Sequence, residues 1–568
     1  MKKLLWLVAL TFLLALAVFT RFYKLSQAPA TLIVDEAHYA YISYSLLKTG
    51  KDEHGMRYPV VFKGFGDYKL PAQAYALLPF VNFFGLNNLS ARLPAALSGI
   101  LLIVVIYLLF LEWNFSKRAA FLAALLTLIS PWTFILSRFA YEANLGLLFF
   151  STALLFIFKA YKNHRLLFFL LGALFLALSV YSYVIYKLLA IFFLIFFAVY
   201  FFFFVKETRV KVLLFVLFFS LLIAPFFFGQ AANSNLARFK QVGVFSNEQL
   251  VAQVNEDRHF CLQNYPKLVC YAIFNKPVVY SKELTNEFIK TYSPEYLFIR
   301  GDENLTYMNV DDTGLFAGFL LPLYLLGVAV FVQKLFSKSK KSKFFLVFLL
   351  SGLLLVPVPG ILSGVQKVRI SALFIFILPI LIMAYEFLRD KLAKKQYYLD
   401  LLLLFLSLLF LLVYFVNFIS VHSSKKDFHY DSFVKGIFAF TSDYLQKNEV
   451  DEVVIQNFFS DPLMYYAYYQ EIEPSVYQQE IILDTSEGSG FQHALALGKY
   501  RVAKNEEPHA LACAAHQTKR KVIYVDNNWS SKQHILARIK SNSGALTYAF
   551  IIDLSSFGAE LARTVKCN

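Results

Sequence analysis

Two adjacent carboxylates, Asp35 and Glu36, follow an apolar run near the N-terminus, in the stretch DEAHYAYISYSLLKTG. A carboxylate fixed beside a hydroxyl can accept its proton, so the pair could supply a general base. The same residues also suit a structural role, because Asp is a favoured N-cap, Glu suits a first helical turn and Gly50 fits a helix end. The pair alone leaves helix capping and proton transfer both open.

Lysines follow the carboxylates in the same polar segment, in KGFGDYKLPAQAYALLP. An ammonium group such as that of Lys63 or Lys69 can hold a phosphate, and Asp67 adds a third carboxylate. The alternative for Lys69 is an interfacial lysine that extends its ammonium group into water. Acids and lysines beside apolar sequence together predict a site for an anionic substrate carried by a lipid.

Further charged and aromatic residues occur at the ends of later apolar runs. Arg138 and Glu142 are four residues apart, so they could simply form an ion pair on one helical face. A charge at the bilayer centre would cost roughly 2.5–3.5 kcal/mol or more, which favours their placement at a membrane surface. Arg369 begins another apolar run, and Tyr183 lies in YSYVIYK, where an interfacial aromatic belt is the alternative explanation. We interpret these groups as candidate substrate contacts.

The composition identifies the elements that must position these residues. The chain has 568 residues, of which 58% are hydrophobic and 16% charged. Apolar runs of about 18 residues or more recur along it, which predicts an α-helical polytopic membrane protein. The first run could be a cleaved signal peptide, but Arg21 and Lys24 separate it from the small residues around Ala28, so we favour a retained span. About eleven spans are predicted, near 4–19, 93–113, 118–136, 145–158, 166–184, 185–205, 211–229, 314–334, 343–361, 367–388 and 398–420.

The basic residues predict the orientation of these spans. If the N-terminus is cytoplasmic, the short inner connections are basic, as in SKR (116–118), KAYKNHR (159–165) and QKLFSKSKKSK (333–343). This pattern follows the positive-inside rule and accounts for most of the formal net charge of +16. The charge therefore requires no nucleic acid partner. Asp35 and the other candidates fall on the outer side, and a plasma membrane location is expected.

Three longer segments should lie outside the membrane: loops 21–92 and 230–313 and the tail from 421. We predict a transmembrane domain over 1–420 and an extracytoplasmic α/β domain over 421–568. In the tail, strands are expected at 451–458, 521–527 and 547–554, and a helix in SKQHILARIKS at 531–541. The four cysteines lie in the outer segments, and their spacing suggests the pairs Cys261–Cys270 and Cys513–Cys567, with four free thiols as the alternative.

Four ordered motifs resemble one family of membrane enzymes. They are DEAHYAYISYSLLKTG, DYKLPAQAYALLPF, LSARLPAALSGILLIVVIYLL and SRFAYEANLGLLFF. Their order and spacing over about 1–190 resemble the C-type membrane glycosyltransferases (GT-C), among them protein O-mannosyltransferases and aminoarabinose transferases. The resemblance implies that Asp35, with Glu36 beside it, is the base or orients the acceptor. It further implies that Glu142 is the acid of the second outer turn, preceded by Arg138, and that Lys69 and Arg369 contact a donor phosphate.

The resemblance implies an inverting transfer of a sugar from a polyprenyl-phosphate donor to a hydroxyl of a protein, lipid or glycan at the outer face. No organic cofactor is expected, and no ligand set in the sequence argues for a metal, so metal dependence stays open. The rival interpretations are a lipid-linked sugar flippase or transporter, and a polysaccharide ligase or polymerase. A flippase should carry ionisable groups within its spans and repeats between its halves, and the sequence shows no convincing repeat.

Overall fold

The chain forms two compact units in the computed structural model, and each is described by itself. The first comprises Met1–Tyr23, Ala95–Ser137 and Glu142–Phe415, and the second Lys24–Pro94, Arg138–Tyr141 and Val416–Asn568. The structure describes residues 2–29, 32–64, 68–228, 248–337, 343–425, 432–484, 492–504, 506–531, 533–541, 544, 546–564 and 567. Asp67 therefore lies outside the described residues.

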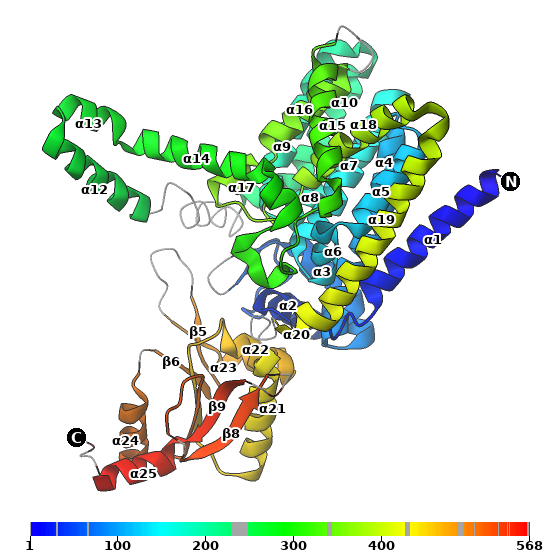
Figure 1. Cartoon of the computed structure of the whole chain (residues 1–568). Coiled ribbons are helices and arrows are strands. Elements are labelled where there is room, and N and C mark those ends of the chain that lie inside the picture. Colours follow the sequence, from blue (N-terminus) through cyan, green and yellow to red (C-terminus); the bar gives the residue numbers. More distant parts are fainter. Residues whose placement is uncertain are drawn as a thin grey trace. The chain divides into compact units, whose positions relative to one another are not determined.

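Long apolar helices make up the first unit (Figure 1). Seven helical segments of the described residues are long and apolar enough to cross a membrane, or eight if α5 and α6, which bend by 55°, form one span. Each predicted apolar run overlaps a helix of the described residues, although the count of eleven spans stays a prediction. The principal helices are α1 (Lys2–Phe22), α4 (Asn88–Glu112), α5 (Lys117–Ile129), α6 (Pro131–Arg138), α7 (Glu142–Asn163), α8 (Leu166–Ser182), α9 (Ile185–Phe204), α10 (Arg209–Ile223), α15 (Leu321–Leu335), α16 (Lys343–Leu355), α17 (Val358–Leu362), α18 (Leu373–Leu392) and α19 (Gln396–Asn417).

Helices α18 and α19 form a turn rather than one continuous rod. Tyr385 donates a hydrogen bond to Asp400 at 2.7 Å, and the Arg389 side chain donates to Gln396 at 2.8 Å. A straight helix would separate positions 385 and 400 by about 22 Å, because each residue rises about 1.5 Å. The break falls at Ala393, whose φ is 45°. The long helical segment Leu373–His422 is therefore long enough for two of the predicted spans.

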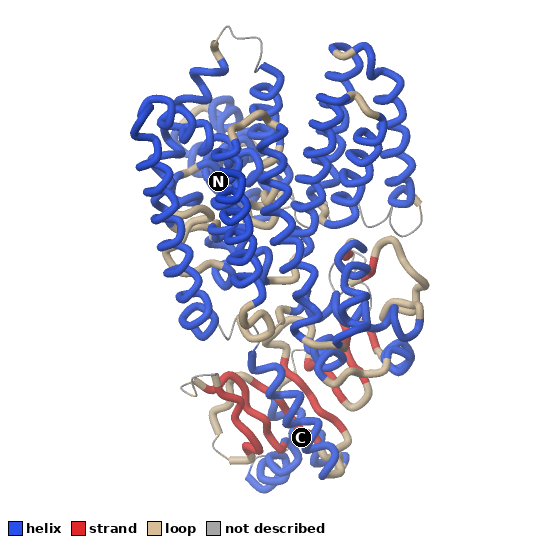
Figure 2. The backbone as a smooth tube through the Cα atoms, turned by 90° about the vertical axis from the view of Figure 1, so that its right-hand side faces the viewer, coloured by secondary structure: helices blue, strands red, loops and turns tan. Residues whose placement is uncertain are grey.

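The C-terminal part of the second unit is built on a seven-stranded sheet, drawn red in Figure 2. The strand order is β4-β5-β6-β3-β7-β9-β8, and the central β3 runs parallel to β6 and β7. This confirms the expected α/β character and the three predicted strands. The strands are β3 (Glu452–Gln456), β4 (Ile482–Leu483), β5 (Ala494–Leu497), β6 (Tyr500–Ala503), β7 (Val522–Asp526), β8 (Ile535–Lys540) and β9 (Thr547–Asp553), and the helices are α21 (Ser432–Lys447), α22 (Pro462–Tyr469), α23 (Pro474–Glu480), α24 (Pro508–Thr518) and α25 (Leu554–Thr564).

The helix expected at 531–541 is wrong, because most of this segment is strand β8. Ile535 and Ile539 are four residues apart, which suits one face of a helix. With Ala537 between them they also alternate along a strand, and β8 pairs antiparallel with β9. The spacing of apolar residues in this short segment suits both a helix and a strand. Its pairing with β9 at the edge of the sheet stabilises the strand.

The segment after the first apolar helix shares a core with this sheet domain. Helix α2 (Val34–Thr49) contributes Ala37, Ala40 and Tyr41 to the same buried cluster as Tyr465 and Tyr477. The Tyr41 hydroxyl donates to the carbonyl of Ile472 at 2.9 Å. The predicted outer loop 21–92 and the tail thus fold together, while the boundary at 420 and 421 stays a prediction. The remaining elements of this segment are β1 (Phe62–Lys63), β2 (Tyr68–Lys69) and α3 (Pro71–Phe84).

Two disulfides join the four cysteines in the predicted pairs. Cys261–Cys270 links α12 (Glu248–Asn264) to α13 (Lys267–Ile273), within the first unit. Cys513–Cys567 links α24 to the residues after α25. Disulfides persist in oxidising compartments, and the outer location of both segments stays a prediction.

Candidate functional site

Asp35 and Lys69 form an ion pair at the start of α2. The carboxylate is 38% exposed, whereas the Lys69 side chain is only 6% exposed. The Lys69 ammonium also lies 5.2 Å from the centre of the Tyr39 ring, one helical turn after Asp35. The pair therefore combines a partly exposed carboxylate with a buried ammonium.

The N-terminus of α2 explains the position of Asp35. The N-cap residue is Ile33, and Asp35 is the second residue of the helix, so it does not act as the N-cap. The backbone N–H of Ile33 instead donates to the Glu36 carboxylate at 3.0 Å. Glu36 therefore satisfies the helix end, which leaves the Asp35 side chain directed to Lys69.

Glu36 is fully buried and connects the start of α2 to the Arg92 side chain and to the backbone of Ala140. One oxygen accepts from the Arg92 Nε at 3.1 Å and from the backbone N–H of Ala140 at 2.8 Å. Arg92 also donates to the carbonyls of Leu25 and Pro29, at 3.0 and 2.8 Å. Because its oxygens are engaged inside the protein, Glu36 fixes the first turn of α2 beside Asp35.

Arg138 is fully buried and binds the same turn that Arg92 binds. Its guanidinium donates to the Ala28 carbonyl at 2.7 Å and to the Lys24 carbonyl at 3.2 Å. The guanidinium also lies 5.5 Å from the centre of the Phe418 ring. These contacts orient the turn before α2.

The structure adds titratable residues that the sequence did not single out. His38 lies one turn after Asp35, and its Nε2 is 2.5 Å from Glu53 in a pair almost entirely buried. Asp461, at the start of α22, faces His493 with 3.5 Å between Oδ1 and Nδ1. Burial raises the pKa of Asp461 above its ordinary value, while nearby His38 and His493 act to lower it. The sheet domain therefore brings a carboxylate and an imidazole to the first outer segment.

Of these additional titratable residues, only His38 could have been associated with Asp35 from the sequence. His38 is three residues after Asp35, so a helical interpretation of the motif places both on one face. Asp461 and His493 lie in the tail and carry no motif that connects them to α2. Lys63 reaches the same domain, since its ammonium donates to Gln492 at 2.6 Å.

Two further carboxylates, Asp52 and Glu53, are buried in the loop after α2. Burial raises the pKa of each to about 7, and the charge of Glu53 adds to the effect on Asp52. Asp52 accepts the backbone N–H groups of His54 and Met56 at 3.0 and 2.7 Å. Burial thus favours the protonated form of both carboxyls in the loop after α2. No group of three or more His, Cys, Asp or Glu side chains could hold a metal ion within the described ranges.

The remaining candidates belong to the first unit. Glu142 is the first residue of α7, and Tyr183, only 5% exposed, ends α8 at its break with α9. The Arg369 guanidinium donates to the carbonyls of Ser363 and Gly364, which curls the loop after α17 around it. Asp35 and Lys69 are thus the predicted site residues that the structure joins to one another.

A family model matches the part of the chain that contains most of the predicted site residues. Residues 11–235 match the family model described as dolichyl-phosphate-mannose-protein mannosyltransferase. Over this part of the chain the match confirms the resemblance to the C-type membrane glycosyltransferases, and it includes Asp35, Lys69 and Glu142. A comparison with curated proteins finds no match.

Solved structures of membrane glycosyltransferases are similar to the chain at low identity. The oligosaccharyltransferase from Archaeoglobus fulgidus in its apo form has a TM-score of 0.49 at 14% identity, with 82% of this chain and 64% of that chain covered. The chain thus spans less than two thirds of the length of the archaeal protein. ArnT from Cupriavidus metallidurans in the apo state has a TM-score of 0.43 at 12% identity, with 98% and 99% covered. The arabinofuranosyltransferase AftD from Mycobacteria has a TM-score of 0.43 at 10% identity, with 98% of this chain and 42% of that chain covered.

Proposed function

We propose that the protein is a multi-pass membrane glycosyltransferase that moves a sugar from a polyprenyl-phosphate donor to a hydroxyl acceptor, with inversion. The observation that carries the proposal is the Asp35–Lys69 pair, a reachable carboxylate beside a buried ammonium. It lies inside the residues that match the mannosyltransferase model. The acceptor is a hydroxyl of a protein, lipid or glycan.

The pair supplies both groups that an in-line displacement needs. The acceptor oxygen forms a bond to the anomeric carbon while its proton passes to the Asp35 carboxylate. The bond from the anomeric carbon to the donor phosphate breaks, and its electrons remain on the leaving phosphate. Lys69 stabilises this developing charge through a charge-assisted hydrogen bond. Attack opposite to the leaving phosphate gives inversion.

The neighbouring residues support these two roles. Glu36 and Arg138 fix the start of α2, so the Asp35 side chain does not have to be ordered when substrate binds. We assign Arg369 to the donor phosphate and Glu142 to the catalytic residues, as the family resemblance implies. Lys63 and Tyr183 are assigned to substrate binding. Asp67 is assigned to the substrate-binding segment with Lys63 and Lys69.

The proposed location is the plasma membrane, with the N-terminus cytoplasmic and the second unit outside. The basic short loops support this orientation through the positive-inside rule. Reporter fusions at Lys340 and at residue 430 should lie on opposite sides. If both reporters lie on one side, the outer location of Asp35 is wrong.

The test uses the full chain, reconstituted with a polyprenyl-phosphate monosaccharide labelled in the sugar and with membrane extract as the acceptor source. The proposal expects release of polyprenyl phosphate together with label on a larger acceptor, and loss of both in Asp35→Asn. Movement of intact donor between leaflets without release would instead support a flippase. Growth of long glycan chains would support a polymerase or ligase.

A further inference from the structure

An arm of three helices projects from the first unit. It consists of α12, α13 and α14 (Lys276–Tyr292), and in Figure 1 α14 runs across the direction of α10, α15 and α16. The C-terminal end of α14 is anchored, because the Tyr292 hydroxyl donates to the Leu353 carbonyl and Glu287 accepts the Val365 N–H at 3.0 Å. The connection between α12 and α13 is therefore the free end of an anchored arm.

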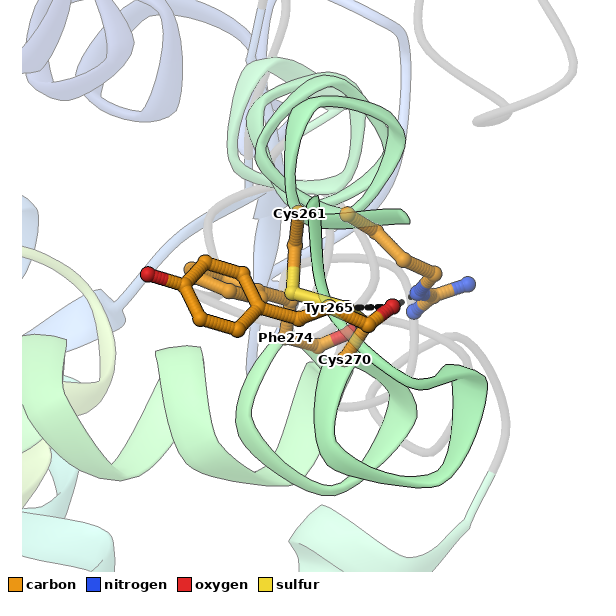
Figure 3. The surroundings of a disulfide bond; sticks show 5 residues. Cys261, Tyr265, Cys270 and Phe274 are labelled. Atoms are coloured by element: carbon orange, nitrogen blue, oxygen red, sulfur yellow. Dashed lines mark hydrogen bonds between the residues drawn. A yellow bond between two sulfur atoms is a disulfide. The ribbon is translucent and has the colours of Figure 1, made fainter. Parts of the chain in front are cut away.

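Covalent and polar contacts fix this free end. The Cys261–Cys270 disulfide joins the two helices, and Arg258 donates to the Phe274 carbonyl at 2.8 Å (Figure 3). The Arg258 guanidinium also lies 4.8 Å from the centre of the Tyr271 ring. The side chains around the disulfide therefore keep a defined arrangement on the surface.

This defined surface is unusually apolar. Leu268 is 84% exposed and Tyr265 is 64% exposed, although both are large apolar side chains. Contiguous exposed apolar groups of this kind mark contact sites. We name these residues the arm tip: Phe260, Leu262, Tyr265, Leu268, Val269, Tyr271 and Ile273.

The charged residues around the arm tip indicate the chemistry of its partner. Arg258, Lys267 and Lys276 are basic. Positions 258–276 contain no Asp or Glu, and Glu256 and Asp257 precede this stretch on α12. Tyrosine and phenylalanine next to lysine are typical of segments that lie in the interface of a bilayer, where apolar groups enter the acyl boundary and basic groups meet lipid phosphates.

We propose that the arm tip inserts into the headgroup region of the bilayer that the same chain spans, with anionic phospholipid as its partner. The arm would then hold α14 along the membrane surface. This inference rests on the exposed side chains and their charge, and it is independent of the proposed glycosyl transfer.

The depth of the arm tip can be measured on the full chain in nanodiscs that contain anionic phospholipid. A nitroxide at Leu268→Cys should collide more often with oxygen than with a water-soluble nickel chelate. The matched control is Lys447→Cys at the end of α21, where the native side chain is 68% exposed and the label should favour the nickel chelate. Equal nickel access at both sites would overturn the proposal. So would shielding of Leu268→Cys from both reagents, which would indicate a protein partner such as a second copy.

The charge dependence is tested in the same preparation. Lys267→Glu with Lys276→Glu should raise the nickel accessibility of the label at least twofold, and nanodiscs of neutral lipid should do the same. The control Lys282→Glu changes a charge on α14 outside the arm tip and should leave the depth unchanged. A label that stays equally deep after the double reversal would overturn the anionic-lipid assignment.

Discussion

The two carboxylates of the first turn of α2 are neighbours in sequence but lie in opposite environments. Asp35 is partly exposed and forms an ion pair with Lys69. Glu36 has no exposed surface and accepts hydrogen bonds from Arg92, Ala140 and Ile33. This difference in accessibility supports the proposal that Asp35 is the reactive group and that Glu36 holds the fold. Each prediction below tests this division, beginning with the largest expected effect.

Removing the partner of Glu36 should destabilise the second unit most. Arg92→Met leaves a buried carboxylate without its counter-charge, which typically costs about 3–5 kcal/mol. We expect a lower unfolding temperature and weak expression of the full chain, measured by thermal unfolding in detergent. Lys63→Met is the control, since Lys63 is not part of this buried network. Near-native stability of Arg92→Met would contradict the structural role of Glu36.

Asp35→Asn should act on turnover more than on stability. The amide preserves the size of the side chain but cannot accept the proton of the acceptor, so we expect a loss of roughly 100-fold or more. Thermal unfolding should change less than in Arg92→Met, because Asp35 is 38% exposed and is not the N-cap, although the Lys69 ammonium loses this partner. Activity close to native would remove Asp35 as the base.

Lys69→Met should weaken donor use by a smaller factor. A hydrogen bond to a charged group contributes about 1.5–3 kcal/mol, which corresponds to roughly tenfold or more in the KM for the donor. Lys69→Arg retains the charge and should recover part of the loss. If Lys69→Met changes only the KM for the acceptor, the phosphate assignment is wrong.

The smallest predicted effect concerns pH. Burial raises the pKa of Glu53 to about 7, so the native state holds a proton that the unfolded state releases at lower pH. The contribution of the Glu53 carboxyl to the free energy of unfolding is therefore fully present in acid. It declines as the pH rises through about 7. Glu53→Gln should therefore flatten the dependence of unfolding temperature on pH between 5 and 7. An unchanged slope would mean that Glu53 does not titrate in this interval.

The sequence predicted features that depend on neighbouring residues and missed those that depend on tertiary contacts. The apolar runs predicted helices because length and composition are local properties, and the motif around Asp35 and Lys69 identified a pair that the structure joins. The pairing of Glu36 with Arg92 joins positions 56 residues apart, and no local pattern encodes it. The sequence did not identify Asp461 as a neighbour of α2, because tertiary packing brings it near His38. It predicted a helix at Ile535, because the pairing with β9 is not visible in the local pattern.

The shared core of α2 and the sheet domain has a consequence for synthesis. Tyr41 and its acceptor Ile472 are separated by 431 positions, so a ribosome completes the tail long after α2 has been made. Until then, the apolar face of α2 has no permanent cover and is open to chaperones and proteases. A nascent chain stopped at residue 420 should accordingly be short-lived in cells, and maturation should begin only when the last quarter of the polypeptide arrives.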